Sequence, residues 1–242
     1  MTDSEIATYV INLPRRTDRR AWMEARLPAD LHATYTSDLD ITIDGRRLTP
    51  TGLRVAGATL FDWCIDSDNP WWNRPLKYGE IGCTLAHLAS WAHAEENTVA
   101  RYILVLEDDA DPASGFVADL VAGLDRLYWQ GEPFDLLYLG RFPLEPDEPA
   151  IPGFVRPGYS HCSFAYLITR FALRTLLSAG LADAVIPIDE FLPAMFLPHP
   201  RGDVQARFPP RLAALAFELP LVAQRPKVEA GSDTEDSDYV AD

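Results

Sequence analysis

The chain has 242 residues and a formal net charge of −15, from 36 acidic and 21 basic residues. This acidic balance argues against nucleic acid as a partner, and the sequence has no polybasic segment that would bind an anionic membrane. Residues 229–242 hold six acids and neither lysine nor arginine. We therefore expect one domain over residues 1–228 and an acidic tail over 229–242.

The N-terminal residues are acidic and do not resemble a secretory signal, and no run of about 18 apolar residues suggests a transmembrane segment. The three cysteines are far apart in the sequence, which favours neither a disulfide framework nor a zinc site. These features predict a protein of the cytoplasm.

The first predicted strand, Ile6 to Leu13, ends at Pro14 and is followed by a short helix from about Asp18 to Arg26. Asn12, Arg16 and Arg19 lie at or just after the strand end. Guanidinium groups in this position suit a phosphate or nucleotide ligand, although a basic surface loop has the same pattern. Residues 30–78 contain short strand-like pieces and the pair Trp71–Trp72, a candidate sugar-stacking platform or simply buried aromatic residues.

A helix is predicted from Tyr78 to Trp91, with Glu80, Cys83 and His87 on one face. Cys83 and His87 are one turn apart and could touch, but nothing in the sequence marks an oxyanion site, so a nucleophilic pair is not the leading hypothesis. Gly79 would let a ligand or strand approach the start of the helix closely, or it could simply serve helix packing.

The most informative segment is residues 101–109, in which a wholly apolar strand ends in Glu107, Asp108 and Asp109. Strand alternation predicts Glu107 and Asp109 on one side and Asp108 on the other. Carboxylates two residues apart at the carboxyl end of a strand can hold a hard divalent cation, and ligands bind at this edge of open α/β sheets. The alternative is a solvated strand end whose acids cap the next helix.

Further along the chain, helices are predicted from about Ser114 to Leu127 and from Arg170 to Ser178, and strands over 134–139 and 163–168. This alternation predicts an α/β domain with a mainly parallel sheet and helices on both faces. From Pro187 onward we expect little regular structure. Asp189 and Glu190 lie between apolar residues and need a partner, either as metal ligand or general base or in a salt bridge to an arginine.

Four segments, residues 9–19, 79–87, 104–109 and 165–169, together resemble glycosyltransferase family 25. Residues 187–196, followed by His199–Pro200 and residues 232–237, narrow the resemblance to the C-terminal transferase domain of the procollagen galactosyltransferases. The resemblance implies a GT-A-like, Rossmann-type fold in a single domain, a UDP-sugar donor such as UDP-galactose, Mn²⁺, and inversion at the anomeric carbon. The acceptor would be a protein, such as hydroxylysine of a collagen-like chain, or a bacterial surface glycan.

With that resemblance, we expect Glu107 and Asp109 to bind the metal, and Asp189 to act as general base with Glu190 as the second choice. The donor would contact Asn12, Arg16, Arg19, Gly79, Glu80, His87 and Asp108. The tail would close over the donor, with Asp233 or Glu235 facing the cation, or would be a disordered, solubilising end. A non-catalytic sugar- or partner-binding protein remains the alternative from another functional class.

Overall fold

The computed structural model describes residues 5–29, 31–39 and 57–240. Its main feature is a mixed eight-stranded sheet in the order β2-β1-β3-β8-β5-β9-β7-β6. The strands in this order are Ala33–Tyr35, Ile6–Ile11, Tyr102–Glu107, Ser160–Thr169, Leu136–Pro143, Ala214–Phe217, Phe154–Arg156 and Glu148–Pro149. Six strands point in one direction, and β8 and β7 run against them. The predicted mostly parallel α/β sheet is confirmed.

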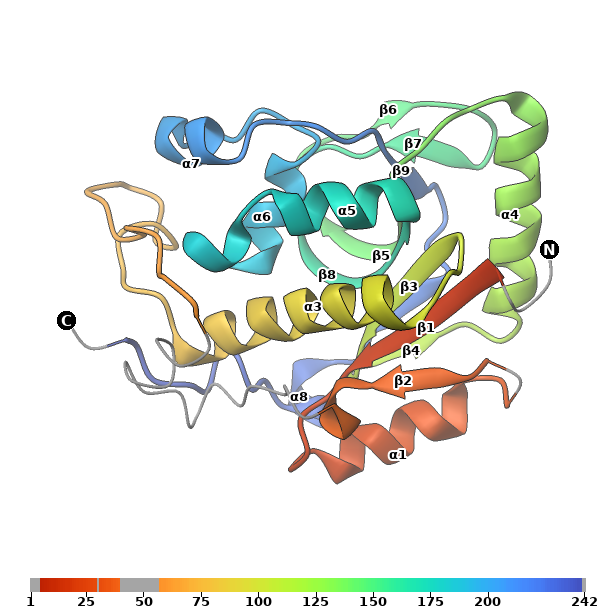
Figure 1. The fold of residues 1–242 in the computed structure, drawn as a ribbon, viewed down its shortest axis with the longest axis horizontal. Coiled ribbons are helices and arrows are strands. Elements are labelled where there is room, and N and C mark those ends of the chain that lie inside the picture. Colours follow the sequence, from red (N-terminus) through yellow and green to blue (C-terminus); the bar gives the residue numbers. More distant parts are fainter. Residues whose placement is uncertain (1–4, 30, 40–56, 241–242) are drawn as a thin grey trace.

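Helices cover both faces of this sheet, as predicted (Figure 1). Helices α3 (Tyr78–Asn97), α5 (Arg170–Ser178) and α6 (Ile188–Ala194) lie over one face, and α1 (Thr17–Arg26) and α4 (Phe116–Gln130) over the other. Strand β3 contributes to the hydrophobic core on each face of the sheet. Ile103 and Val105 pack on the side of α3, α5 and α6, and Leu104 and Leu106 on the side of α1 and α4. A wholly apolar strand is what burial on both faces requires.

The strand register brings the candidate residues to one edge of the sheet. Ile11, at the end of β1, pairs in parallel with Glu107, at the end of β3, so Asn12 and Asp108 follow side by side. Strand β8 runs antiparallel to β3, which brings its first residues, from Ser160, to the same edge. The carboxyl ends of two parallel strands therefore meet the beginning of β8 here.

The C-terminal quarter corrects one expectation, because it contains regular structure beyond Pro187. Helix α6 is followed by α7 (Gly202–Arg207), β9, β10 (Val222–Gln224) and α8 (Lys227–Ala230). Strand β10 pairs antiparallel with β4 (Ala110–Pro112), which directly follows Glu107, Asp108 and Asp109, called here the acidic triplet. These segments are only three to seven residues long, so they have little periodicity of their own.

The described part of the tail packs beside the start of α3. The backbone N–H of Tyr78 donates to the carbonyl of Asp238, and that of Val240 to the carbonyl of Leu76. The predicted strand-like pieces over residues 30–78 and the predicted tail over 229–242 are only partly described, since residues 30, 40–56 and 241–242 lie outside the described ranges. Within the described ranges, no helix combines the length and the apolar character needed to cross a bilayer.

Candidate functional site

Two connected cavities lie at the edge of the sheet where β1, β3 and β8 meet. The inner pocket, of about 70 Å³, is bounded by the end of β1, the first turns of α3 and the acidic triplet, and its lining includes Asn12, Arg15, Gly79, Cys83 and Asp108. The outer cleft, of about 560 Å³, extends toward β8, α6 and the tail. Both cavities share the side chains of Arg19, Cys83, Glu107, Asp233 and Thr234.

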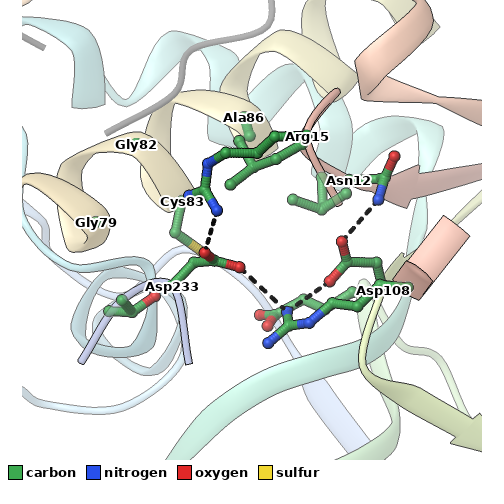
Figure 2. A pocket seen from close by; sticks show the side chains of 13 residues that line it. Asn12, Arg15, Gly79, Gly82, Cys83, Ala86, Asp108 and Asp233 are labelled. Carbon is green, nitrogen blue, oxygen red and sulfur yellow. Dashed lines mark hydrogen bonds and ion pairs between the residues drawn. The ribbon is translucent and has the colours of Figure 1, made fainter. Parts of the chain in front are cut away.

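Asp108 forms one wall of the inner pocket and is held by two of the residues predicted to bind the donor. Asn12 Nδ2 donates to Asp108 Oδ2 at 2.8 Å (Figure 2), and Arg19 Nη1 donates to Asp108 Oδ1 at 2.7 Å. Burial raises the pKa of Asp108, and the bonds from Arg19 and Asn12 oppose that rise. Arg19 also donates to the carbonyls of Ala230 and Gly231, so it ties the acidic triplet to the tail.

Glu107 and Asp109 lie where few protein groups would balance a negative charge on their carboxyl groups. Both line the outer cleft, which Asp108 does not. Burial raises the pKa of Glu107 to about 8, and the charges of Asp189 and Asp108 add to that effect. Burial and the Glu107 charge raise the pKa of Asp109 to about 6. Asp109 Oδ1 is buried with no hydrogen-bond partner among the described residues, so the pair is suited to a cation.

His87, on α3, is fully buried and lies close to Glu107. Its Nδ1 lies 2.7 Å from the Tyr166 hydroxyl, which also accepts a hydrogen bond from Trp91 Nε1. Its Nε2 lies 3.7 Å from Glu107 Oε1. Burial lowers the pKa of His87 to about 4, so the ring is neutral at physiological pH. Cys83, one turn earlier, lies on the same helix face as His87, as the sequence predicts.

Gly79 and Glu80 shape the beginning of α3. A side chain at Gly79 would lie 2.6 Å from the carbonyl oxygen of Asp233, so only glycine lets the tail pass this close. Glu80 caps the helix by accepting from the Lys77 backbone N–H at 2.7 Å, and it forms an ion pair with Arg74. Glu80 also lines the outer cleft, but these partners occupy both of its carboxylate oxygens.

Arg16 does not line either cavity in the described part of the chain, whereas its neighbour Arg15 lines the inner pocket. Both arginines donate to the carboxylate of Asp233 at 2.5 Å, and Figure 2 shows Arg15 pointing toward Asp233. Arg16 also pairs with Asp18. Asp233 therefore bridges two arginines, where we had expected it or Glu235 to face a cation.

Asp189, at the start of α6, lines the outer cleft together with Glu107 and Asp109. Its Oδ1 accepts a hydrogen bond from the Ser163 backbone N–H at 2.9 Å. Cys162, the residue before Ser163, has a left-handed φ of 57° and lies where the pairing of β5 and β8 is irregular. This local distortion turns the backbone of β8 toward Asp189.

Glu190 is 4% exposed, also lines the outer cleft, and is held by a polar network. Tyr159 OH and His199 Nε2 contact its Oε2, and Trp72 Nε1 donates to its Oε1. Burial disfavours the charge, but hydrogen bonds from His161, His199 and Tyr159 outweigh it and hold the pKa of Glu190 below its ordinary value. Within the described ranges, a salt bridge to an arginine, one of the alternatives for these acids, is not what holds Glu190, whose partners are histidine, tyrosine and tryptophan.

Of this network, His199 had been quoted in the sequence analysis as part of a resemblance and Trp72 as half of an aromatic pair, whereas Tyr159 and His161 had not been noticed. Nothing in their local pattern marks them, because they lie about 30 residues from Glu190, His161 near the start of β8 and Tyr159 just before that strand. The two adjacent tryptophans have different environments. Trp71 is 50% exposed at the outer cleft, whereas Trp72 turns to Glu190 and packs near His199.

With this geometry in place, comparison with known proteins gives the family. A model of glycosyltransferase family 25, described as an LPS biosynthesis protein family, matches residues 5–128. This range covers half of the chain and includes β1, the start of α3 and the acidic triplet. The chain belongs to glycosyltransferase family 25.

Curated members of glycosyltransferase family 25 match over most of this chain. A probable inactive glycosyltransferase 25 family member 3 from Bos taurus is 33% identical over 97% of the chain and 38% of its own length. Procollagen galactosyltransferase 1-A from Xenopus laevis is 33% identical over 97% of the chain and 37% of its own length. Human procollagen galactosyltransferase 2 is 30% identical over 88% of the chain. The chain thus spans less than two fifths of the length of these relatives.

Proposed function

We propose that this chain is a metal-dependent inverting glycosyltransferase that moves a sugar, galactose in the first instance, from a UDP-sugar to an acceptor hydroxyl. The observation that carries the proposal is the group of carboxylates from Glu107, Asp109 and Asp189 around one cleft of about 560 Å³. Membership of glycosyltransferase family 25 supports the reaction class. The procollagen galactosyltransferases among the relatives support galactose as the donor sugar.

The residues at the end of β3 fit a hard divalent cation such as Mn²⁺. Asp109 offers a buried oxygen with no partner among the described residues, and Glu107 offers a second carboxylate to the same cleft. Cations that bridge phosphates need few protein ligands, because the phosphates and water complete the shell. When bound, the cation would neutralise the diphosphate and stabilise the UDP leaving group.

The inner pocket suits the nucleoside end of the donor. It is adjacent to the Glu107–Asp109 pair and contains both apolar and hydrogen-bonding groups, including Leu13, Ala86 and Asn12. Arg15 at its rim and Arg19 at its junction with the cleft supply positive charge. Arg19 would act mainly by holding Asp108 and the triplet in place, since its guanidinium already forms three hydrogen bonds.

Asp189 is the better-supported general base. It lines the cleft, and the Ser163 N–H fixes one of its oxygens. Its carboxylate would accept the proton of the acceptor hydroxyl as that oxygen attacks the sugar opposite UDP. Glu190 is less suited, because hydrogen bonds occupy both oxygens and hold its pKa low. Glu190 instead anchors His161 and Tyr159 beside the cleft.

Two acceptor classes follow from the relatives' names. The procollagen galactosyltransferases suggest a hydroxylysine-bearing collagen-like protein, and the family description suggests a lipopolysaccharide-type glycan. A non-catalytic role is the second candidate function, because several similar relatives are named inactive or probably inactive. The carboxylates in the cleft favour the enzyme, since a purely structural site would leave Asp109 Oδ1 unpaired at a cost.

A donor screen tests the proposal. Thermal unfolding is measured with Mn²⁺ and each of a set of nucleotide sugars, because a ligand that binds only the folded state raises the melting temperature by mass action. We expect UDP-sugars, and UDP-galactose above the others, to raise it. Mn²⁺-dependent release of UDP from the same donor then separates an enzyme from a binding protein. A shift without UDP release, with every acceptor class present, would support the non-catalytic role.

A further inference from the structure

Three potential metal ligands lie together where α3 passes the end of β3. Cys83 and His87 project from α3 one turn apart, and Glu107 ends β3. The Cys83 sulfur, a His87 ring nitrogen and a Glu107 oxygen all lie within 4.8 Å of one another. His87 Nε2 lies 3.7 Å from Glu107 Oε1. Two ligand atoms bound to the same tetrahedral ion, each through a bond of about 2.0–2.2 Å, are separated by a similar distance.

The second observation is the state of the His87 ring. Its Nε2 is fully buried, faces Glu107 and has no hydrogen-bond partner among the described residues. Its other nitrogen, Nδ1, is fixed by the Tyr166 hydroxyl at 2.7 Å, and Trp91 fixes that hydroxyl in turn. A histidine that ligates a metal through one nitrogen is usually oriented through the other in this way. The unpartnered Nε2 of His87 therefore lies close to two further potential ligands, the Cys83 sulfur and a Glu107 oxygen.

We infer that Cys83, His87 and Glu107 form a binding site for a divalent transition metal of the zinc type. Thiolate and imidazole donors select Zn²⁺ or Co²⁺ over Mn²⁺ or Mg²⁺, and two ligands one helical turn apart are a common basis for such sites. On binding, the Cys83 thiol gives its proton to solvent and the sulfur takes the metal. His87 then keeps its ring proton on Nδ1, which donates to the Tyr166 oxygen.

Three protein ligands leave a fourth tetrahedral position for water or a ligand. Cys83 and Glu107 both line the inner pocket and the outer cleft, so this position would be reached from those cavities. The site differs from the proposed donor-cation site in its donors, because Asp109 takes no part and sulfur and nitrogen replace oxygen. It shares only Glu107, and it does not depend on the chain being a glycosyltransferase.

Cobalt titration of the full, metal-stripped chain tests the inference, since bound thiolate gives Co²⁺ an intense near-ultraviolet charge-transfer band. We expect one equivalent of Co²⁺ to produce this band, and Zn²⁺ to abolish it by displacement. The band should be lost in Cys83→Ser and in His87→Gln. It should persist in Cys162→Ser, the matched control at the other cysteine of the cleft, and in Asp109→Asn.

Absence of the band in the wild-type chain, or a band that survives Cys83→Ser, overturns the inference. A band lost in Cys162→Ser would also overturn it, because the metal would then sit elsewhere in the cleft. Melting curves without metal establish that each variant is folded, and calorimetric Zn²⁺ titration gives a second readout if Cys83→Ser is destabilised. Asp109→Asn separates the two proposals, since it should retain Co²⁺ binding and lose Mn²⁺-dependent turnover.

Discussion

At the scale of single residues, Asp189 and Glu190 are neighbours in the sequence with opposite surroundings. Both line the outer cleft, but Asp189 has one hydrogen-bonded oxygen, whereas Glu190 is buried with both oxygens bonded. Adjacent residues at the start of a helix point in directions about 100° apart, so they enter different environments. We therefore assign proton transfer to the first and organisation of the cleft wall to the second.

Asp189→Asn tests this assignment because it keeps the shape and removes the base. We expect kcat to fall by about 10²–10⁴-fold, the usual contribution of a general base, with UDP affinity unchanged. Steady-state kinetics and calorimetry measure the two quantities. Glu190→Gln is the contrasting variant, and its main effect should be a lower melting temperature through the damaged network. Wild-type kcat in Asp189→Asn would remove Asp189 from the chemistry.

His161 gives a prediction about pH. Burial lowers the pKa of His161, but Glu190 and then Asp189 outweigh burial and raise it above the ordinary value of 6.5. The ion pair with Glu190 therefore stabilises the fold fully below pH 6.5, and this contribution is lost as pH rises through the folded-state value. The melting temperature of wild type minus that of His161→Gln should be largest at low pH and shrink above neutrality. A difference that grows with pH would contradict the stated direction.

At the scale of elements, the sequence predicted most helices and central strands because each carries its own signal. Helix α5 was placed at Arg170–Ser178 by Thr169 before it and Gly180 after it, and the structure agrees. The predicted strand over 134–139 is wrong at both ends, since β5 begins at Leu136 and continues through Gly140 to Pro143. Gly140 does not end the strand. It is required because a side chain there would strike the carbonyl of Val222 and the ring of Phe164.

The Thr169 cap can be tested by substitution. Its side chain accepts a hydrogen bond from the Ala172 backbone N–H at 3.1 Å. We expect Thr169→Ala to reduce the free energy of unfolding by about 1 kcal/mol, as for other N-cap threonines. Thr175→Ala, inside the same helix, should cause no loss because alanine is the better helix former. Chemical denaturation compares the two, and equal effects would contradict the cap.

The candidate site was predictable only in part, for a physical reason. Glu107, Asp109 and Asp189 stood out because acids beside apolar runs need a partner, and the structure brings all three to one cleft. The role of Arg16 was harder to foresee, because its partner Asp233 is set by tertiary packing, whereas Arg74, the partner of Glu80, is only six residues away. Contacts across more than 200 residues, such as that between Arg16 and Asp233, leave no local pattern to read.

At the scale of the whole molecule, Asp233 joins the two ends of the described chain. It pairs with Arg15 and Arg16, whose charges hold the pKa of Asp233 below its ordinary value against the effect of burial. We expect Asp233→Asn to lower the free energy of unfolding by about 1.5–3 kcal/mol, the range for hydrogen bonds to charged groups. Asp236→Asn, exposed in the same segment, should have little effect. Equal stability of the two variants in urea would contradict this role of the tail.

The central claim is that the carboxylates at the end of β3 make this member of glycosyltransferase family 25 a metal-dependent enzyme. The most direct measurement is UDP release from UDP-galactose, with and without Mn²⁺, by wild type, Asp109→Asn and the matched control Asp111→Asn, whose side chain instead lies near Arg26. We predict Mn²⁺-dependent release by wild type and Asp111→Asn. In Asp109→Asn we expect kcat to fall by about 10²-fold or more, corresponding to about 2.7 kcal/mol of transition-state stabilisation. Release that needs no divalent cation, or wild-type turnover in Asp109→Asn, would contradict the account.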